Sequence, residues 1–109
     1  MINVLKIVFA AIFLIMVSTV SIASLRENIF AIPSVVTSDP WFVATLVDAY
    51  VGFTIFYLWV CSKEKTLVSK VVWFFAIMLL GNIATSAYVL IALFKLRSSD
   101  SIRDLLVRN

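Results

Sequence analysis

The side chains best placed to do chemistry in this sequence are a few polar residues inside long apolar runs. Asp48 is the only charged residue between Trp41 and Ser62, and the chain contains no His. A charged side chain at the centre of a bilayer costs about 2.5–3.5 kcal/mol on insertion scales, so it marks either a functional site or a contact between helices. Asp48 is therefore the first candidate.

Amide and hydroxyl side chains elsewhere in the chain could pair with Asp48. Asn82 and Thr85 fall within one sector of about 100° on a helix, with Ser86 at its edge. Counted from the charged loop between the two runs, they lie at the same depth as Asp48, and Ser18 lies at a similar depth in the first run. We expect an intramembrane polar cluster of these five residues, in which Asp48 donates a hydrogen bond.

Three interpretations of this cluster remain open. The first is purely structural, with Asp48 holding helices in register where the hydrophobic effect cannot. The second is a proton or cation station in a transport pathway. The third is a site for an apolar ligand with a polar handle, such as a lipid, a quinone or a pigment, whose magnesium Asp48 or Asn82 could ligate through oxygen.

Three apolar runs must position these residues, and they predict an all-α integral membrane protein. Ile7–Leu25 and Val71–Phe94 hold no charged residue, and Trp41–Ser62 holds only Asp48. Because about 20 helical residues cross a bilayer, we expect three transmembrane helices, at about 5–25, 40–61 and 70–95, in an up-down-up bundle. Residues 1–109 are then one membrane domain, with the first run an uncleaved anchor.

Local signals define the ends of two elements. Asp39 is a good N-cap and Pro40 suits the first helical position, so the second span should begin there. The tail at 96–109 is predicted to be a short amphipathic helix, because Ser101 and Asp104 have capping-box spacing; a frayed, solvated tail is the alternative.

Orientation is poorly determined if there are three spans. The N-terminal side would then carry four basic residues, Lys6, Lys63, Lys65 and Lys70. The other side would carry five, Arg26, Lys95, Arg97, Arg103 and Arg108. The two counts are too close for the positive-inside rule to decide, and Lys6 before the first span gives only a weak preference for a cytoplasmic N-terminus.

Composition excludes most familiar chemistry. The 109 residues are 63% hydrophobic and 14% charged, with nine basic and six acidic residues, one Cys and no His. A surplus of this size, scattered along the chain, does not indicate nucleic-acid binding. We expect no disulfide, no metal site and no catalytic residues, and so neither an enzyme nor a protein with an established cofactor.

Two stretches resemble a family of small membrane proteins from plants and bacteria that is described only as a domain of unknown function. They are "PWFVATLVDAY" and "VVWFFAIMLLGNIATSAYVLIALFKL", and the resemblance covers about residues 40–96. It rests on the Pro-Trp start, the Ala-Thr-Leu-x-Asp-x-Tyr run and the Gly-Asn-Ile-Ala-Thr patch. It implies a small polytopic membrane protein, with no known activity, substrate or cofactor.

The expected function is therefore a non-catalytic one. Three short helices with little soluble chain are typical of a structural or accessory subunit of a larger membrane complex. The alternatives are a proton- or cation-coupled transport component that uses Asp48, and a lipid-, quinone- or pigment-binding protein. The expected partners are membrane lipids and other membrane subunits, in the plasma membrane or an organelle membrane.

Overall fold

The structure is all-α, as the sequence predicts. The computed structural model describes residues 2–97 and 99–107, apart from the Phe30 side chain, so Ser98, Arg108 and Asn109 of the predicted tail lie outside the described residues. Two long helices, α1 (Ile2–Arg26) and α3 (Pro40–Lys63), are long and apolar enough to cross a membrane. The shorter helical elements are η1 (Ile29–Ala31), α2 (Ser34–Thr37), α4 (Leu67–Leu80), α5 (Asn82–Phe94) and α6 (Ile102–Leu106).

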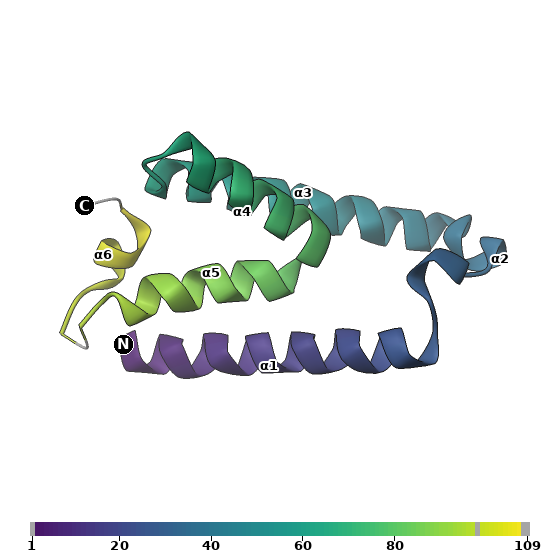
Figure 1. Cartoon of the computed structure of the whole chain (residues 1–109), viewed down its shortest axis with the longest axis horizontal. Coiled ribbons are helices and arrows are strands. Elements are labelled where there is room, and N and C mark those ends of the chain that lie inside the picture. Colours follow the sequence, from purple (N-terminus) through teal and green to yellow (C-terminus); the bar gives the residue numbers. More distant parts are fainter. Residues whose placement is uncertain (1, 98, 108–109) are drawn as a thin grey trace.

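The third apolar run is not the single helix expected over residues 70–95. It is two helices, α4 and α5, separated at Gly81, whose φ of 59° and ψ of −127° place it in a region that only glycine adopts readily. The chain reverses there, and α5 runs back beside α4 (Figure 1). The Trp73 and Tyr88 rings, at similar distances on either side of Gly81, lie 4.8 Å apart. The expected up-down-up arrangement of three long helices is therefore replaced by two long helices and a short hairpin.

The α4–α5 hairpin lies between the two long helices and provides most of the buried core. On one side, Val89 and Leu93 of α5 pack with Ile2 of α1 and Leu105 of α6. On the other side, Val60 of α3 and Ile77 of α4 pack with Ala84 and Tyr88 of α5. Each long helix is thus held mainly through the hairpin.

Two tyrosines of α3 fix the antiparallel register of α3 and α4. The Tyr57 hydroxyl donates to the Lys70 carbonyl oxygen at 2.9 Å, and the Tyr50 hydroxyl donates to the Met78 carbonyl oxygen at 3.2 Å. The last carbonyls of a helix have no intrahelical partner. Tyr50 therefore satisfies one of the free carbonyls at the end of α4, close to the reversal.

Both predicted helix starts are confirmed. Asp39 accepts hydrogen bonds from the backbone N–H groups of Trp41 (2.9 Å) and Phe42 (3.3 Å), with Pro40 as the first residue of α3. At α6 the backbone N–H of Ser101 donates to Asp104 at 2.9 Å, as a capping box requires.

The C-terminal helix α6 packs against the end of the bundle. The alternative prediction of a frayed, solvated tail is therefore wrong for this helix. Leu105 is 6% exposed within the core cluster. The Trp59 indole N–H donates to the Leu106 carbonyl oxygen at 2.9 Å, and the Lys63 ammonium donates to the Leu105 carbonyl oxygen. The N-terminus, the loop between α3 and α4, and α6 thus gather at one end of the molecule (Figure 1).

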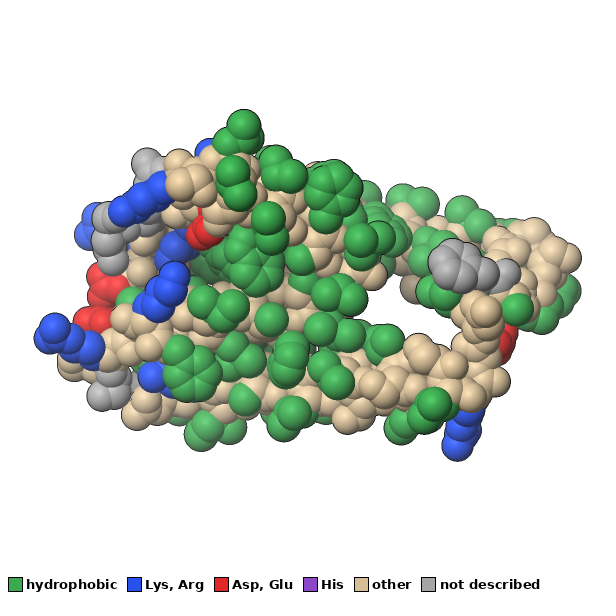
Figure 2. All heavy atoms as spheres, viewed as in Figure 1, with side chains coloured by type: hydrophobic (Ala, Val, Ile, Leu, Met, Phe, Trp, Pro, Cys, Tyr) green, Lys and Arg blue, Asp and Glu red, His purple; other side chains and the backbone are tan. Residues whose placement is uncertain are grey.

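The other end of the molecule is open. Beyond the hairpin tip, α1 and α3 are separated until the segment containing η1 and α2 joins them (Figure 1), and an opening passes between them in the space-filling view (Figure 2). The end of α1 and this connecting segment also line a cavity of about 890 Å³. Its apolar lining includes Val20, Ala23, Ile29, Ile32 and Val36.

The reversal predicts a sharp difference between the two glycines. A Cβ at Gly81 would lie 3.0 Å from the Phe53 ring in a backbone conformation that L-residues avoid, so Gly81→Ala should lower the free energy of unfolding by about 1–3 kcal/mol. Gly52→Ala is the matched control, because a Cβ at Gly52 meets nothing within 4 Å and alanine favours a helix. Denaturant titration of Trp fluorescence in mixed micelles measures both. Equal stabilities for the two variants would contradict the role of Gly81.

Candidate functional site

The structure brings three of the five predicted polar residues to one cavity. Asp48 of α3 and Asn82 and Thr85 of α5 line a cavity of about 310 Å³ beside the hairpin tip. The rest of the lining comes from Ala49, Gly52, Phe53 and Phe56 of α3. A volume of this size can hold several water molecules or a small ligand.

Helix geometry explains why these residues meet. Asp48, Gly52 and Phe56 are spaced four residues apart and therefore share one face of α3. Helix α4 runs antiparallel to α3 up to Gly81, so the first turn of α5 arrives at the level of Asp48. At a rise of about 1.5 Å per residue, Asp48 lies about 12 Å along α3 from Pro40, well within the apolar part of the helix.

The polar side chains of the first turn of α5 form hydrogen bonds within that helix. Thr85 donates to the Asn82 side-chain oxygen at 3.1 Å. Ser86, only 1% exposed, donates to the carbonyl oxygens of Asn82 (2.6 Å) and Ile83 (3.1 Å). In the part of the chain that the structure describes, Asp48 is exposed and no hydrogen bond joins it to another side chain, so the predicted hydrogen bond from Asp48 is wrong. Asp48 shares only the lining of the cavity with Asn82 and Thr85.

Ser86 and Ser18 do not line this cavity. Ser86 is turned into the backbone of α5, and Ser18 is an exposed residue of α1, which packs on α5 nearer its own N-terminus. The reason lies in the short hairpin. Beyond its tip no helix lies between α1 and α3, which remain apart, so a residue of α1 at similar depth is not brought to Asp48 (Figure 1).

The first turn of α5 gives the cavity a complementary polarity. The first backbone N–H groups of a helix have no intrahelical acceptor and carry a partial positive charge. No side chain caps this end of α5, whose N-cap is Gly81. The Asp48 carboxylate, which accepts hydrogen bonds when ionised, lines the same cavity. The arrangement can therefore hold water or a small polar group between a carboxyl and a helix N-terminus.

A second polar centre lies at the other end of the hairpin, and the sequence reasoning missed it. Glu64 accepts hydrogen bonds from the hydroxyls of Ser69 and of Tyr88, the latter at 2.9 Å. Tyr88 is 5% exposed, and its ring makes edge contacts with Phe56, Trp59 and Trp73.

The sequence offers two isolated residues as signals for this centre, but it does not show that they meet. Glu64 is the only acidic residue between Asp48 and Asp100, and Tyr88 is the only tyrosine of the third run. In one continuous span Tyr88 would lie far from Glu64. Only the reversal at Gly81 returns it to the loop.

Metal-ligating side chains are not clustered in the described residues. No group of three or more His, Cys, Asp or Glu side chains lies close enough together there to hold an ion. The free Cys61 is half-buried near the end of α3.

Comparison with known families extends the resemblance noted from residues 40–96. Curated proteins and solved structures give no match. One family model, described as a protein of unknown function (DUF1475), matches residues 1–108, which include α1. The chain therefore belongs to this uncharacterised family.

Proposed function

We propose that the chain is a non-catalytic subunit of a membrane assembly, with α1 and α3 as its spans and α4–α5 as a re-entrant hairpin. The observation that carries the proposal is the short hairpin, which fills only one half of the space between the two long helices (Figures 1 and 2). A membrane interior contains no empty space, so the open half must be filled by lipid or by another chain.

The helix lengths support a re-entrant hairpin. At about 1.5 Å per residue, the 14 residues of α4 and the 13 of α5 extend about 20 Å each, short of the hydrocarbon thickness of about 30 Å. Helices α1 and α3, with 25 and 24 residues, exceed that thickness. Irregular backbone at membrane depth is tolerated where protein buries it or a polar cavity adjoins it, as at Gly81.

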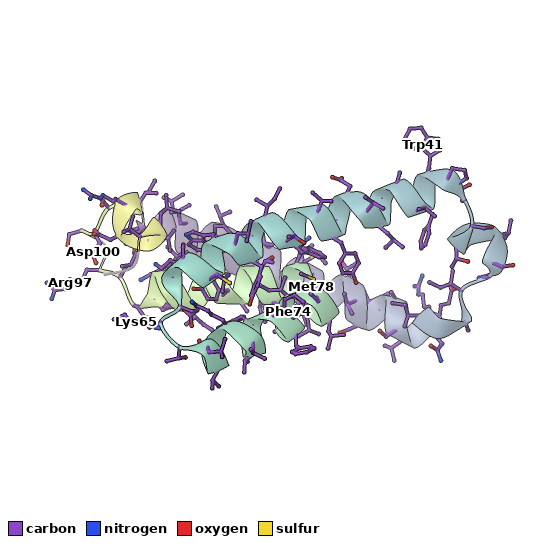
Figure 3. All side chains as sticks on the ribbon, turned by 90° about the horizontal axis from the view of Figure 1, so that it is seen from above. Trp41, Lys65, Phe74, Met78, Arg97 and Asp100 are labelled. Carbon is purple, nitrogen blue, oxygen red and sulfur yellow. The ribbon has the colours of Figure 1, made fainter. Side chains whose placement is uncertain are left out.

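The charges support the same topology. Of the eight Lys and Arg residues that the structure describes, Arg26 alone lies at the open end. The other seven lie at the end that holds the N-terminus and α6, where Lys65 and Arg97 are seen opposite Trp41 (Figure 3). They are Lys6, Lys63, Lys65, Lys70, Lys95, Arg97 and Arg103. Under the positive-inside rule this basic end faces the cytoplasm.

The surface around the open half supports a protein partner. Small residues let helices approach closely in lipid, where packing rather than the hydrophobic effect drives association. Ala23 and Ser24, at the open end of α1, line the 890 Å³ cavity and are exposed. A helix from another membrane chain would find a surface there that its backbone can approach.

The topology predicts where reporters will lie. Reporter domains fused at the N-terminus and at the C-terminus should both be cytoplasmic, because the hairpin returns the chain to the side it left. A reporter inserted at Ser38, in the connecting segment, should lie on the opposite side. Activity of periplasmic and cytoplasmic reporter enzymes measures this. Fused ends on opposite sides would show a third full span and refute the hairpin.

The subunit proposal predicts a size change. The full chain, extracted in mild detergent, should migrate in a complex larger than a monomer. Ala23→Trp should shift it towards the monomer, because the indole occupies the surface that a partner helix needs. Ala11→Trp is the matched control, since Ala11 is exposed on α1 in the half beside α5. Native-size chromatography with light scattering measures both. Wild-type migration as a bare monomer would sink the proposal.

A second candidate function is favoured by the cavity at Asp48. Discontinuous helices whose ends meet at membrane depth form the ion and substrate sites of many transporters. Asp48 lies across a cavity from such an end, the uncapped start of α5. The second candidate is therefore a proton or cation station in which Asp48 gains and loses its charge.

Two substitutions distinguish structural from transport roles for Asp48. Asp48→Leu should lower the free energy of unfolding by about 1–2 kcal/mol if the role is structural, because it removes the carboxyl group that shares a cavity with the first turn of α5. Asp48→Asn keeps a polar side chain and should unfold like the wild type. If Asp48 is a station, wild-type liposomes should show a pH-driven cation flux that Asp48→Asn abolishes. Wild-type liposomes without such a flux would exclude the second candidate.

A further inference from the structure

Three lysines surround two adjoining hollows at the basic end of the molecule. Lys63, Lys65 and Lys95 line a hollow of about 310 Å³ and a neighbouring one of about 300 Å³, and Glu64 lines both as well. The lysines come from the end of α3, from the loop after it and from the end of α5. The hairpin therefore brings together positive charges that a continuous third span would separate by the thickness of the membrane.

The carboxylates nearby are already hydrogen-bonded to groups other than these lysines. Glu64 accepts from the hydroxyls of Ser69 and Tyr88. Asp104, which lines the larger hollow, accepts from the backbone N–H of Ser101 at 2.9 Å. The hydrogen bond and ring contact of the Lys63 ammonium are to the Leu105 carbonyl oxygen and the Trp59 ring. The smaller hollow is therefore lined by three lysines and one carboxylate, and the larger hollow by three lysines and two carboxylates. The net charge of the lining residues is positive in both hollows.

The larger hollow also has a largely apolar part, here called its floor. Trp73 of α4 and Tyr88, Ile91 and Ala92 of α5 line this part. Ile91 is 47% exposed, so the hollow opens onto the outer surface of the hairpin. A ligand that fits both parts has an anionic group for the lysines and an apolar chain for the floor.

We propose that Lys63, Lys65 and Lys95 bind the phosphate of an anionic phospholipid, with its acyl chain along Trp73 and Ile91. Basic pockets between helices on the cytoplasmic side are suited to lipid headgroups, since each lysine near the surface adds attraction for anionic lipid. The inference rests on the proposed membrane placement of α3 and the hairpin, but does not require a protein partner.

Native mass spectrometry of the full chain in detergent tests this site, because a micelle lacks the surface potential of an anionic bilayer. The wild type should retain one phosphatidylglycerol in preference to phosphatidylcholine with the same acyl chains. The double variant Lys65→Gln/Lys95→Gln should bind phosphatidylglycerol about 25-fold more weakly, at about fivefold per lysine. Neither the Lys65 nor the Lys95 side chain makes a hydrogen bond in the described part of the chain. The melting temperature of the double variant without added lipid should therefore match that of the wild type.

Lys6→Gln/Lys70→Gln is the control, with the same loss of charge at the same end but outside both hollows. It should change the affinity less than twofold. An equal loss in the control would show unspecific attraction and overturn the site. Equal retention of phosphatidylcholine would show that the lysines do not select an anionic headgroup, and would overturn the proposed site. Inorganic phosphate provides a second test of the hollows. If phosphate raises the melting temperature of the wild type but not of Lys65→Gln/Lys95→Gln, and no phosphatidylglycerol is retained, the hollows bind a free anion and the lipid proposal is overturned. A monomeric wild type that still retains the lipid would refute the subunit proposal alone.

Discussion

Backbone polar groups that lie among apolar side chains need hydrogen-bond partners, and the arrangement around Gly81 depends on this constraint. A reversal within an apolar run ends one helix and begins another in a segment whose side chains offer few hydrogen-bond partners. The positive φ of Gly81 makes the turn possible. Tyr50 accounts for one free carbonyl of α4. The hydroxyls of Ser86 and Thr85 donate to a carbonyl oxygen in the first turn of α5 and do not cap its free N–H groups. The reversal therefore explains Tyr50, whereas the start of α5 has no side-chain cap.

Asp48 gains a physical meaning from the same reversal. It lies on α3 at the level of the hairpin tip and lines a cavity with the first turn of α5, whose N–H groups carry partial positive charge. A carboxyl in this position can be held by water between itself and the helix end. A structural role and an ion-binding role place the Asp48 carboxyl group in the same position. The two roles differ in whether this carboxyl group must ionise.

The hairpin also determines what the two ends of the molecule can do. At the closed end it gathers the N-terminus, the loop after α3 and α6, and with them the Glu64–Tyr88 hydrogen bond and the lysine-lined hollows. At the open end α1 and α3 lie apart, and Ala23 lines a cavity whose other lining residues are mostly apolar. One end therefore carries most of the positive charge, and the other has a cavity with a largely apolar lining.

The sequence by itself determined the all-α class and two apolar helices long enough to span a membrane, because these follow from local composition. It also determined the cap at Asp39 and the capping box at Ser101. The shared depth of Asp48, Asn82 and Thr85 follows from residue spacing. The sequence did not determine that the third run reverses, since an uncharged run of that length has the composition of one continuous span. The Gly-Asn pair at 81–82 and the nearly balanced charges of a three-span topology were the available signals. The tertiary structure decided the rest. The Phe53 ring lies where a side chain at position 81 would stand, and Tyr88 returns to Glu64. Whether Gly81 bends the chain depends on these contacts, which join residues distant in the sequence.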